Sequence, residues 1–133
     1  MIGTRIYSGA PFEAMAGYAR AVVDPPYVFV SGTTGFDPET LQFPEDVESQ
    51  CENCFATIGR ALVKAGATMN DLVRIRVFVA SRAEFERIKP IIKRHCDAAR
   101  PANTTVLAEL VEPYMRVEIE VTARLSAVEQ GRP

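Results

Sequence analysis

Two cysteines three residues apart are the pair in this sequence that most resembles a reactive centre. Cys51 and Cys54 have the spacing of a redox disulfide, but such pairs sit at a helix N-terminus, where the helix dipole lowers a thiol pKa. Here an apolar repeat begins a turn earlier, at Val47, and both cysteines lie on its apolar stripe. The spacing therefore predicts two thiols packed in a core.

The single histidine is the other candidate for metal or acid-base chemistry. His95 is followed by Cys96 and Asp97, but neighbours in a helix point in different directions and do not converge on one ion. The sequence also has no glycine-rich phosphate loop and no Gly-x-Ser-x-Gly turn. We therefore expect no metal site.

The middle of the chain changes its apolar period from that of a helix to that of a strand. Within 47–62 apolar residues recur at steps of three, four and seven, which predicts a helix that stops near Gly66. Within 73–79 apolar residues alternate with Arg74, Arg76 and Phe78, which predicts a strand with one buried face.

The flanking segments predict further strands and a second helix. A short buried strand is expected over 27–31, with a possible partner strand over 20–23 and a long loop over 36–46. Ser81 and Glu84 have the spacing of a capping box that opens a helix. Pro90 interrupts its pattern and predicts either a kink or a helix in two pieces.

The end of the chain contains two more apolar segments. We expect a strand over 103–110 and another over 115–125, where apolar and polar residues alternate, and we expect the two to pair as a hairpin. Right-handed crossovers would place both helices on one face of the sheet. The opposite face would carry mixed charges and Phe78, which suits either solvent or another subunit; the charged residues are Arg74, Arg76, Arg116, Glu118, Glu120 and Arg124.

Composition limits the class of protein. The 133 residues are 47% hydrophobic and 24% charged, and no linker splits them, which predicts one α+β domain over 1–133 with a frayed tail at 129–133. A net charge of -2 without a basic cluster argues against a nucleic-acid partner. No apolar run long enough to span a membrane and no signal peptide are present, and three cysteines fit a reducing compartment, so we expect a cytoplasmic protein without a membrane partner.

Five short segments, taken in order, resemble one known family. They are Ser31-Gly32, Ala65-Gly66-Ala67, Asp71-Leu72-Val73 leading to Val77-Phe78-Val79, Pro101-Ala102 and Glu118-Ile119-Glu120. Their order and spacing resemble the Rid family, also called the YjgF/YER057c/UK114 family, from about Gly17 to Ala123. The resemblance implies a chorismate-mutase-like mixed β-sheet with two helices on one face, and a homotrimeric barrel with clefts between subunits.

The resemblance also implies a reaction and candidate residues. The best-known members hydrolyse enamines or imines such as 2-aminoacrylate to a 2-keto acid and ammonia, without a metal or organic cofactor. Glu118 matches the family's acid, which orients or deprotonates water. Tyr18 matches a tyrosine that lines the cleft from a loop, and Ser31-Gly32 would present backbone groups to a small-molecule ligand. Glu118 is otherwise a sheet-face charge paired with Arg116 or Arg74, and Tyr18 otherwise only packs.

One position departs from the family pattern. Where deaminating members have an arginine that grips the substrate carboxylate, this chain has Asn103, followed by Thr104. An amide brings no charge, so carboxylate binding would weaken by about one to two powers of ten. We expect Asn103 and Thr104 to contact substrate, unless Asn103 only starts an edge strand. Lys89 stands where the family often has an asparagine, and its ammonium either replaces the missing charge or is a solvated surface group.

Three functions remain open at this point. The first is a cofactor-free hydrolase for a small carbonyl or imine compound, with classical 2-aminoacrylate deamination made doubtful by Asn103. The second is a non-catalytic small-molecule binder or sensor that keeps the trimeric cleft. The third, an endoribonuclease of the L-PSP type, conflicts with the acidic balance of the chain.

Overall fold

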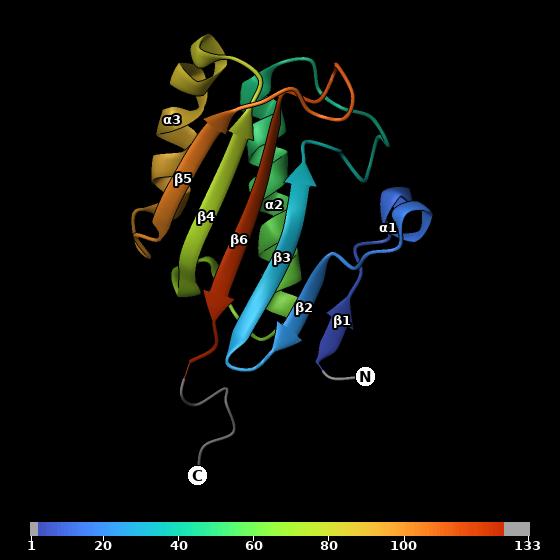
Figure 1. Ribbon diagram of the computed structural model, residues 1–133, viewed down its shortest axis with the longest axis vertical. Coiled ribbons are helices and arrows are strands. Elements are labelled where there is room, and N and C mark those ends of the chain that lie inside the picture. The colour runs from blue at the N-terminus through green and yellow to red at the C-terminus, as the bar shows by residue number, and fades with distance from the viewer. Residues whose placement is uncertain (1–2, 127–133) are drawn as a thin grey trace.

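The computed structural model describes residues 3–126, which form a six-stranded mixed sheet with two long helices on one face (Figure 1). In chain order the elements are β1 (Thr4–Ile6), α1 (Pro11–Ala16), β2 (Ala21–Asp24), β3 (Tyr27–Thr34), α2 (Val47–Lys64), the 3-10 turn η1 (Met69–Asp71), β4 (Leu72–Val79), α3 (Arg82–Cys96), β5 (Ala102–Leu107) and β6 (Val117–Arg124). The predicted α+β class is therefore confirmed. No helix among the described residues is long and apolar enough to cross a membrane. The expected tail at 129–133 lies outside the described residues.

Helix α2 forms where its apolar repeat predicts it. The Asp46 carboxylate accepts a hydrogen bond of 2.8 Å from the Ser49 amide and caps the first turn. The apolar stripe of the helix packs into the core against β3 and β6. The helix ends before Gly66, whose φ of 87° is the left-handed conformation that glycine adopts without strain. The predicted helix and its stop are confirmed.

The sheet order differs from the expected hairpin. The strands lie in the order β1-β2-β3-β6-β4-β5, so β6 lies between β3 and β4 and is antiparallel to both. Strand β5 instead pairs in parallel with the far side of β4. The predicted hairpin of 103–110 with 115–125 is therefore wrong. The connection between the two segments is too long for a tight turn, and β6 buries both its edges by pairing at the centre of the sheet.

Helix α3 tolerates its proline. Ser81 caps it by accepting a hydrogen bond from the Glu84 amide, as the capping spacing predicts. The helix runs through Pro90 as one element, so of the two predicted alternatives, a kink or a helix in two pieces, the second is wrong. Pro90 is exposed, whereas Ile88 and Ile92 face the core. The proline ring therefore lies on the solvent side of the helix, where water can reach the carbonyl that lacks its usual donor.

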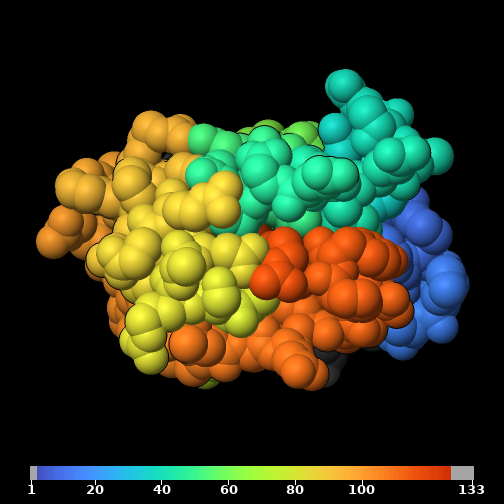
Figure 2. Space-filling model, turned by 90° about the horizontal axis from the view of Figure 1, so that it is seen from above, coloured from blue at the N-terminus to red at the C-terminus, as the bar shows by residue number. Residues whose placement is uncertain are grey.

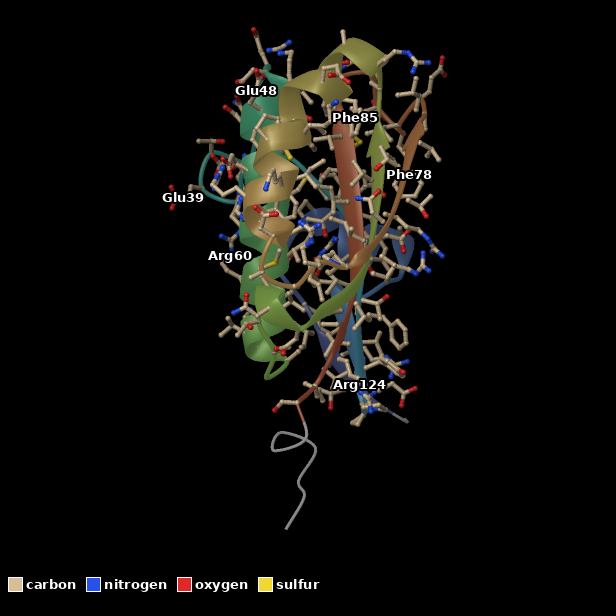
Figure 3. The ribbon with its side chains drawn as sticks, turned by 90° about the vertical axis from the view of Figure 1, so that its left-hand side faces the viewer. Glu39, Glu48, Arg60, Phe78, Phe85 and Arg124 are labelled. Carbon is tan, nitrogen blue, oxygen red and sulfur yellow. The ribbon has the colours of Figure 1, made fainter. Side chains whose placement is uncertain are left out.

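The face of the sheet away from the helices is uncovered in the single chain. Figure 3 shows Phe78 and Arg124 on the opposite side of the sheet from α2 and α3. This face also carries exposed aromatic side chains, Tyr27 and Phe29. Arg116 does not belong to it, contrary to expectation, because its guanidinium pairs with Glu84 of α3.

Three segments gather at one end of the molecule. Figure 2 shows the loop that follows β3, the loop that precedes β6 and the region of α1 lying close to one another at this end. Their aromatic rings are in contact, with centroid distances of 5.3 Å between Phe12 and Phe36, 5.8 Å between Phe36 and Phe43, and 5.0 Å between Phe43 and Tyr114. These contacts fix the three segments around a cavity.

Candidate functional site

A cavity of about 870 Å³ lies among α1, the end of β3, the start of β6 and the C-terminal half of α2. Its lining includes four of the residues that the sequence singled out, Tyr18, Ser31, Gly32 and Glu118. These residues come from the loop after α1, from β3 and from β6. Pairing of β3 with β6 brings Gly32 and Glu118 together, although 85 residues separate them in the chain.

Glu118 is placed by an irregularity in β3. The β3–β6 register shifts between Val30 and Thr33, and Thr34 then lies opposite Glu118. The Glu118 carboxylate lies directly against Gly32, where any side chain carbon would overlap it. A side chain at position 32 would therefore displace the Glu118 carboxylate, and this close approach, not a turn, accounts for the glycine, since Gly32 lies within β3.

Burial raises the pKa of the Glu118 carboxyl above its ordinary value of 4.5, and the nearby Arg20 guanidinium offsets part of this effect. No ion pair of Glu118 with Arg116 or Arg74 is present among the described residues, so the alternative of a paired surface charge is wrong. A carboxylate whose pKa lies nearer to neutrality is a more effective general base.

Arg20 is the buried cation of the cavity, and sequence reasoning missed it. Its Nη1 donates to the Gly32 carbonyl oxygen at 2.8 Å and to Thr33 Oγ1 at 3.0 Å, and its Nε donates to Glu13 Oε2 at 3.1 Å. The guanidinium also lies 5.4 Å from the centre of the Tyr18 ring. Arg20 therefore holds together the loop after α1 and the bulged part of β3.

Glu13 completes this buried network from α1. Its carboxylate accepts hydrogen bonds from the Ser8 amide and hydroxyl as well as from Arg20. Burial alone would raise the pKa of Glu13, but the hydrogen bonds from Ser8 and Arg20 outweigh it and lower the pKa. No sequence signal reveals this pair, because α1 has only six residues and an arginine just before a strand has no periodic pattern.

Three predicted substrate contacts lie elsewhere in the single chain. Asn103 and Thr104 are exposed on β5, at the opposite edge of the sheet from β1. Asn103 does start an edge strand, and its Oδ1 accepts a hydrogen bond from Thr105. Lys89 is exposed on α3 and pairs with Glu86 at 2.9 Å. These residues could join the cavity only from a neighbouring subunit.

The cysteines and the histidine take structural positions. Cys51 and Cys54 are buried and form no disulfide, and burial raises the pKa of Cys51 to about 12 and that of Cys54 well above the ordinary range. His95 stacks on Phe55 at 4.2 Å and contacts Glu52 through Nε2. The predicted core packing of Cys51 and Cys54 is confirmed. No group of three metal-ligating side chains is placed to hold an ion within residues 3–126.

Known proteins resemble this chain over most of its length. The family model described as Endoribonuclease L-PSP matches residues 8–125. The chain is 31% identical over 113 residues to a chloroplastic Reactive Intermediate Deaminase A of Arabidopsis thaliana, covering 84% of this chain and 60% of that protein. It is 29% identical over 121 residues to a 2-iminobutanoate/2-iminopropanoate deaminase of Capra hircus, covering 90% of this chain and 88% of that protein.

The structural comparison extends over nearly the whole chain. A crystal structure from Mycobacterium tuberculosis, of a member of the YjgF/YER057c/UK114 family, superposes with a TM-score of 0.84. Its sequence is 33% identical, and the match covers 92% of this chain and 99% of that one. The similarity therefore extends over most of the fold.

Proposed function

Because the chain belongs to the Endoribonuclease L-PSP family, which is the YjgF/Rid family, we propose that it is a cofactor-free hydrolase for a small imine, enamine or carbonyl compound. The observation that carries the proposal is the Glu118 carboxylate, which lies in the cavity against Gly32 with a pKa raised by burial. The deaminase names of two relatives support the reaction class.

Glu118 acts as the general base in this proposal. It takes a proton from a water molecule, whose oxygen attacks the electrophilic carbon of the C=N bond. Return of that proton to nitrogen gives a carbinolamine. Transfer of its hydroxyl proton to nitrogen, as the C=O bond forms and the C–N bond breaks, releases ammonia and leaves a carbonyl compound, so atoms and charge balance without an oxidant. A positioned carboxylate contributes about 10²–10⁴-fold to such a proton transfer.

The proposed assembly is a homotrimer in which the uncovered sheet face is buried. The exposed aromatic side chains of that face, Tyr27 and Phe29, support it because a single chain would leave them in water. Asn103 and Thr104 would then reach the cavity from the edge strand of a neighbouring subunit. Light scattering at micromolar concentration should give three times 14.6 kDa, and a particle of 14.6 kDa would remove the proposed contacts of Asn103, Thr104 and Lys89.

The test of the reaction is a coupled assay with enzymatically generated 2-aminoacrylate and related imines. Glu118→Gln should lower turnover by about 10²-fold or more, since the amide cannot accept the proton. Glu120→Gln is the matched control, because Glu120 is on the same face of β6 and pairs with Arg76 instead of lining the cavity. Equal turnover in the wild type and Glu118→Gln would refute the general-base role.

Asn103 favours a second candidate, a small-molecule binder or sensor without catalysis. An amide on the edge strand supplies no charge for a substrate carboxylate. Thermal stabilisation of the wild type by 2-keto acids without any product would support this candidate. If deaminase activity appears only in Asn103→Arg, the scaffold retains its chemistry but has a different ligand specificity.

A further inference from the structure

The cavity is larger than a three- or four-carbon imine requires. Its volume of about 870 Å³ lies near the upper end of the range of ordinary small-molecule sites, roughly 300–1,000 Å³. Glu118 and Gly32 line the cavity from the sheet, whereas Thr57, Arg60 and Lys64 line it from the C-terminal half of α2. The space beyond Glu118 is therefore available to the rest of a longer ligand.

Much of the cavity wall is apolar. Phe12 and Met15 line the cavity from α1, and Phe36 and Leu41 line it from the loop after β3. Met15 is 81% exposed and Leu41 is 69% exposed. Large apolar side chains that remain exposed around a cavity indicate a surface that is covered by an apolar group in use.

Two cations lie at the rim of this space without a carboxylate partner. Among the described residues no carboxylate lies within salt-bridge distance of Arg60 or Lys64, and Glu118 is the only acid in the lining. By contrast, four of the five Lys and Arg side chains of α3 pair with a carboxylate: Arg87, Lys89, Lys93 and Arg94. Figure 3 shows Arg60 on α2, the helix that carries both rim cations.

Local hydrogen bonds hold both side chains at the rim. Arg60 Nη2 donates to Thr57 Oγ1 at 3.0 Å, and Lys64 Nζ donates to the Tyr7 carbonyl oxygen at 3.4 Å. Neither contact neutralises the cation. The two residues are four apart on one face of α2, so a single anion can contact both.

Helix geometry indicates how far the two cations lie from Glu118. Cys54 Sγ lies 3.9 Å from the carbonyl oxygen of Val117, the residue before Glu118, which marks the level of Glu118 along α2. At 1.5 Å of rise per residue, Arg60 lies about 9 Å and Lys64 about 15 Å further along the helix axis. An anion held by these two residues is thus well separated from a reacting carbon at Glu118.

We infer that the cavity takes an elongated organic carboxylate, whose apolar body lies against Phe12, Met15, Phe36 and Leu41 and whose anionic end binds Arg60 and Lys64. The inference rests on the proposed function for what happens at Glu118, but the binding itself does not. The carboxylate-binding charge then comes from α2 of the same subunit, and the strand position of Asn103 is not needed for it.

Calorimetric titration of the wild type with butanoate, octanoate and octanamide tests the inference without any turnover. Octanoate should bind roughly tenfold or more tightly than either of the others. Butanoate has the anionic end but too short an apolar chain, and octanamide has the chain but no charge. In Arg60→Gln/Lys64→Gln, the affinity for octanoate should fall about tenfold and that for octanamide should not change.

Arg82→Gln is the matched control, because Arg82 is exposed on α3 and lies outside the cavity lining. Both rim side chains are exposed, so the double variant should unfold at the wild-type temperature. Equal affinity of the wild type for octanoate and octanamide, or unchanged octanoate affinity in the double variant, would overturn the inference. If Glu118→Gln nevertheless lost turnover, the proposed reaction at Glu118 would stand although the proposed carboxylate site had failed. The two proposals can therefore fail independently.

Discussion

Two Arg–Glu ion pairs of this chain lie in opposite surroundings. Arg20 and Glu13 are 3.1 Å apart beneath the cavity, with side chains only 5% and 4% exposed. Arg87 and Glu48 are 2.7 Å apart between α3 and α2, with side chains 53% and 40% exposed. The exposed pair is the shorter one, and both of its bonds are well formed. If the distance between the charged atoms alone decided how much a pair stabilises the fold, the exposed pair would contribute more.

Burial reverses that order. Breaking a buried pair leaves a charge in a region that water cannot reach, whereas water solvates both partners of a broken surface pair. The chain therefore depends on Arg20 and Glu13 to shape the cavity, and it uses the α2–α3 pairs as minor contacts between packed helices. Variants at the two pairs can test this difference directly.

Removing the buried cation should have the largest effect. Arg20→Met should lower the free energy of unfolding by about 3–5 kcal/mol, because Glu13 is left buried without its partner. Urea denaturation at neutral pH measures this change. The double variant Arg20→Met/Glu13→Leu should recover most of the stability, since neither charge then remains. A double variant as unstable as Arg20→Met would show that packing, and not the charge, is responsible.

Changing the buried acid should have a smaller, pH-dependent effect. Glu13→Gln keeps an oxygen that can accept from Arg20 but loses the charge, so the cost at neutral pH should be about 2 kcal/mol. The folded-state pKa of Glu13 lies below 4.5, so its contribution is fully present above pH 4.5 and disappears as the pH falls through the folded value. Urea curves for the wild type and Glu13→Gln should therefore converge in acid. A constant difference down to low pH would contradict the assignment.

The charge of Glu118 should affect stability in the opposite direction from that of Glu13. Its folded-state pKa is raised by burial, so ionised Glu118 destabilises the fold at neutral pH. Glu118→Gln should therefore raise the melting temperature by about 2–4 °C at pH 7 while it lowers turnover. The gain should vanish in acid, where the carboxyl is protonated in both folded and unfolded chains. A lower melting temperature at pH 7 would mean that Arg20 stabilises Glu118 more than burial destabilises it.

Local patterns predicted the elements of this fold better than their partners. The helix at 47–64 and the strand at 72–79 follow directly from apolar periodicity, because each buries one face against the same core. The pairing of 102–107 and 117–124 did not follow, because strand order depends on contacts between distant segments. Adjacency in sequence therefore predicts a pairing of these two segments that the sheet does not contain.

The candidate site shows the same limit at the level of side chains. Family resemblance predicted Tyr18, Ser31, Gly32 and Glu118, and the fold brings all four to one cavity. Arg20 was missed, although it touches two of those positions, because its partners come from three separate segments and none of them has a repeating pattern. A buried polar network is a tertiary feature, and its residue types differ little from those of the surface.

The smallest effect should come from the exposed pair. Arg87→Gln should change the melting temperature by less than about 2 °C, because both partners remain solvated when the pair is broken. Even this difference should shrink in high salt, whereas the loss in Arg20→Met should persist, since mobile ions do not reach a buried pair. Differential scanning calorimetry at low and high salt compares the two variants. A salt-insensitive loss in Arg87→Gln as large as that in Arg20→Met would show that burial does not set the importance of these pairs.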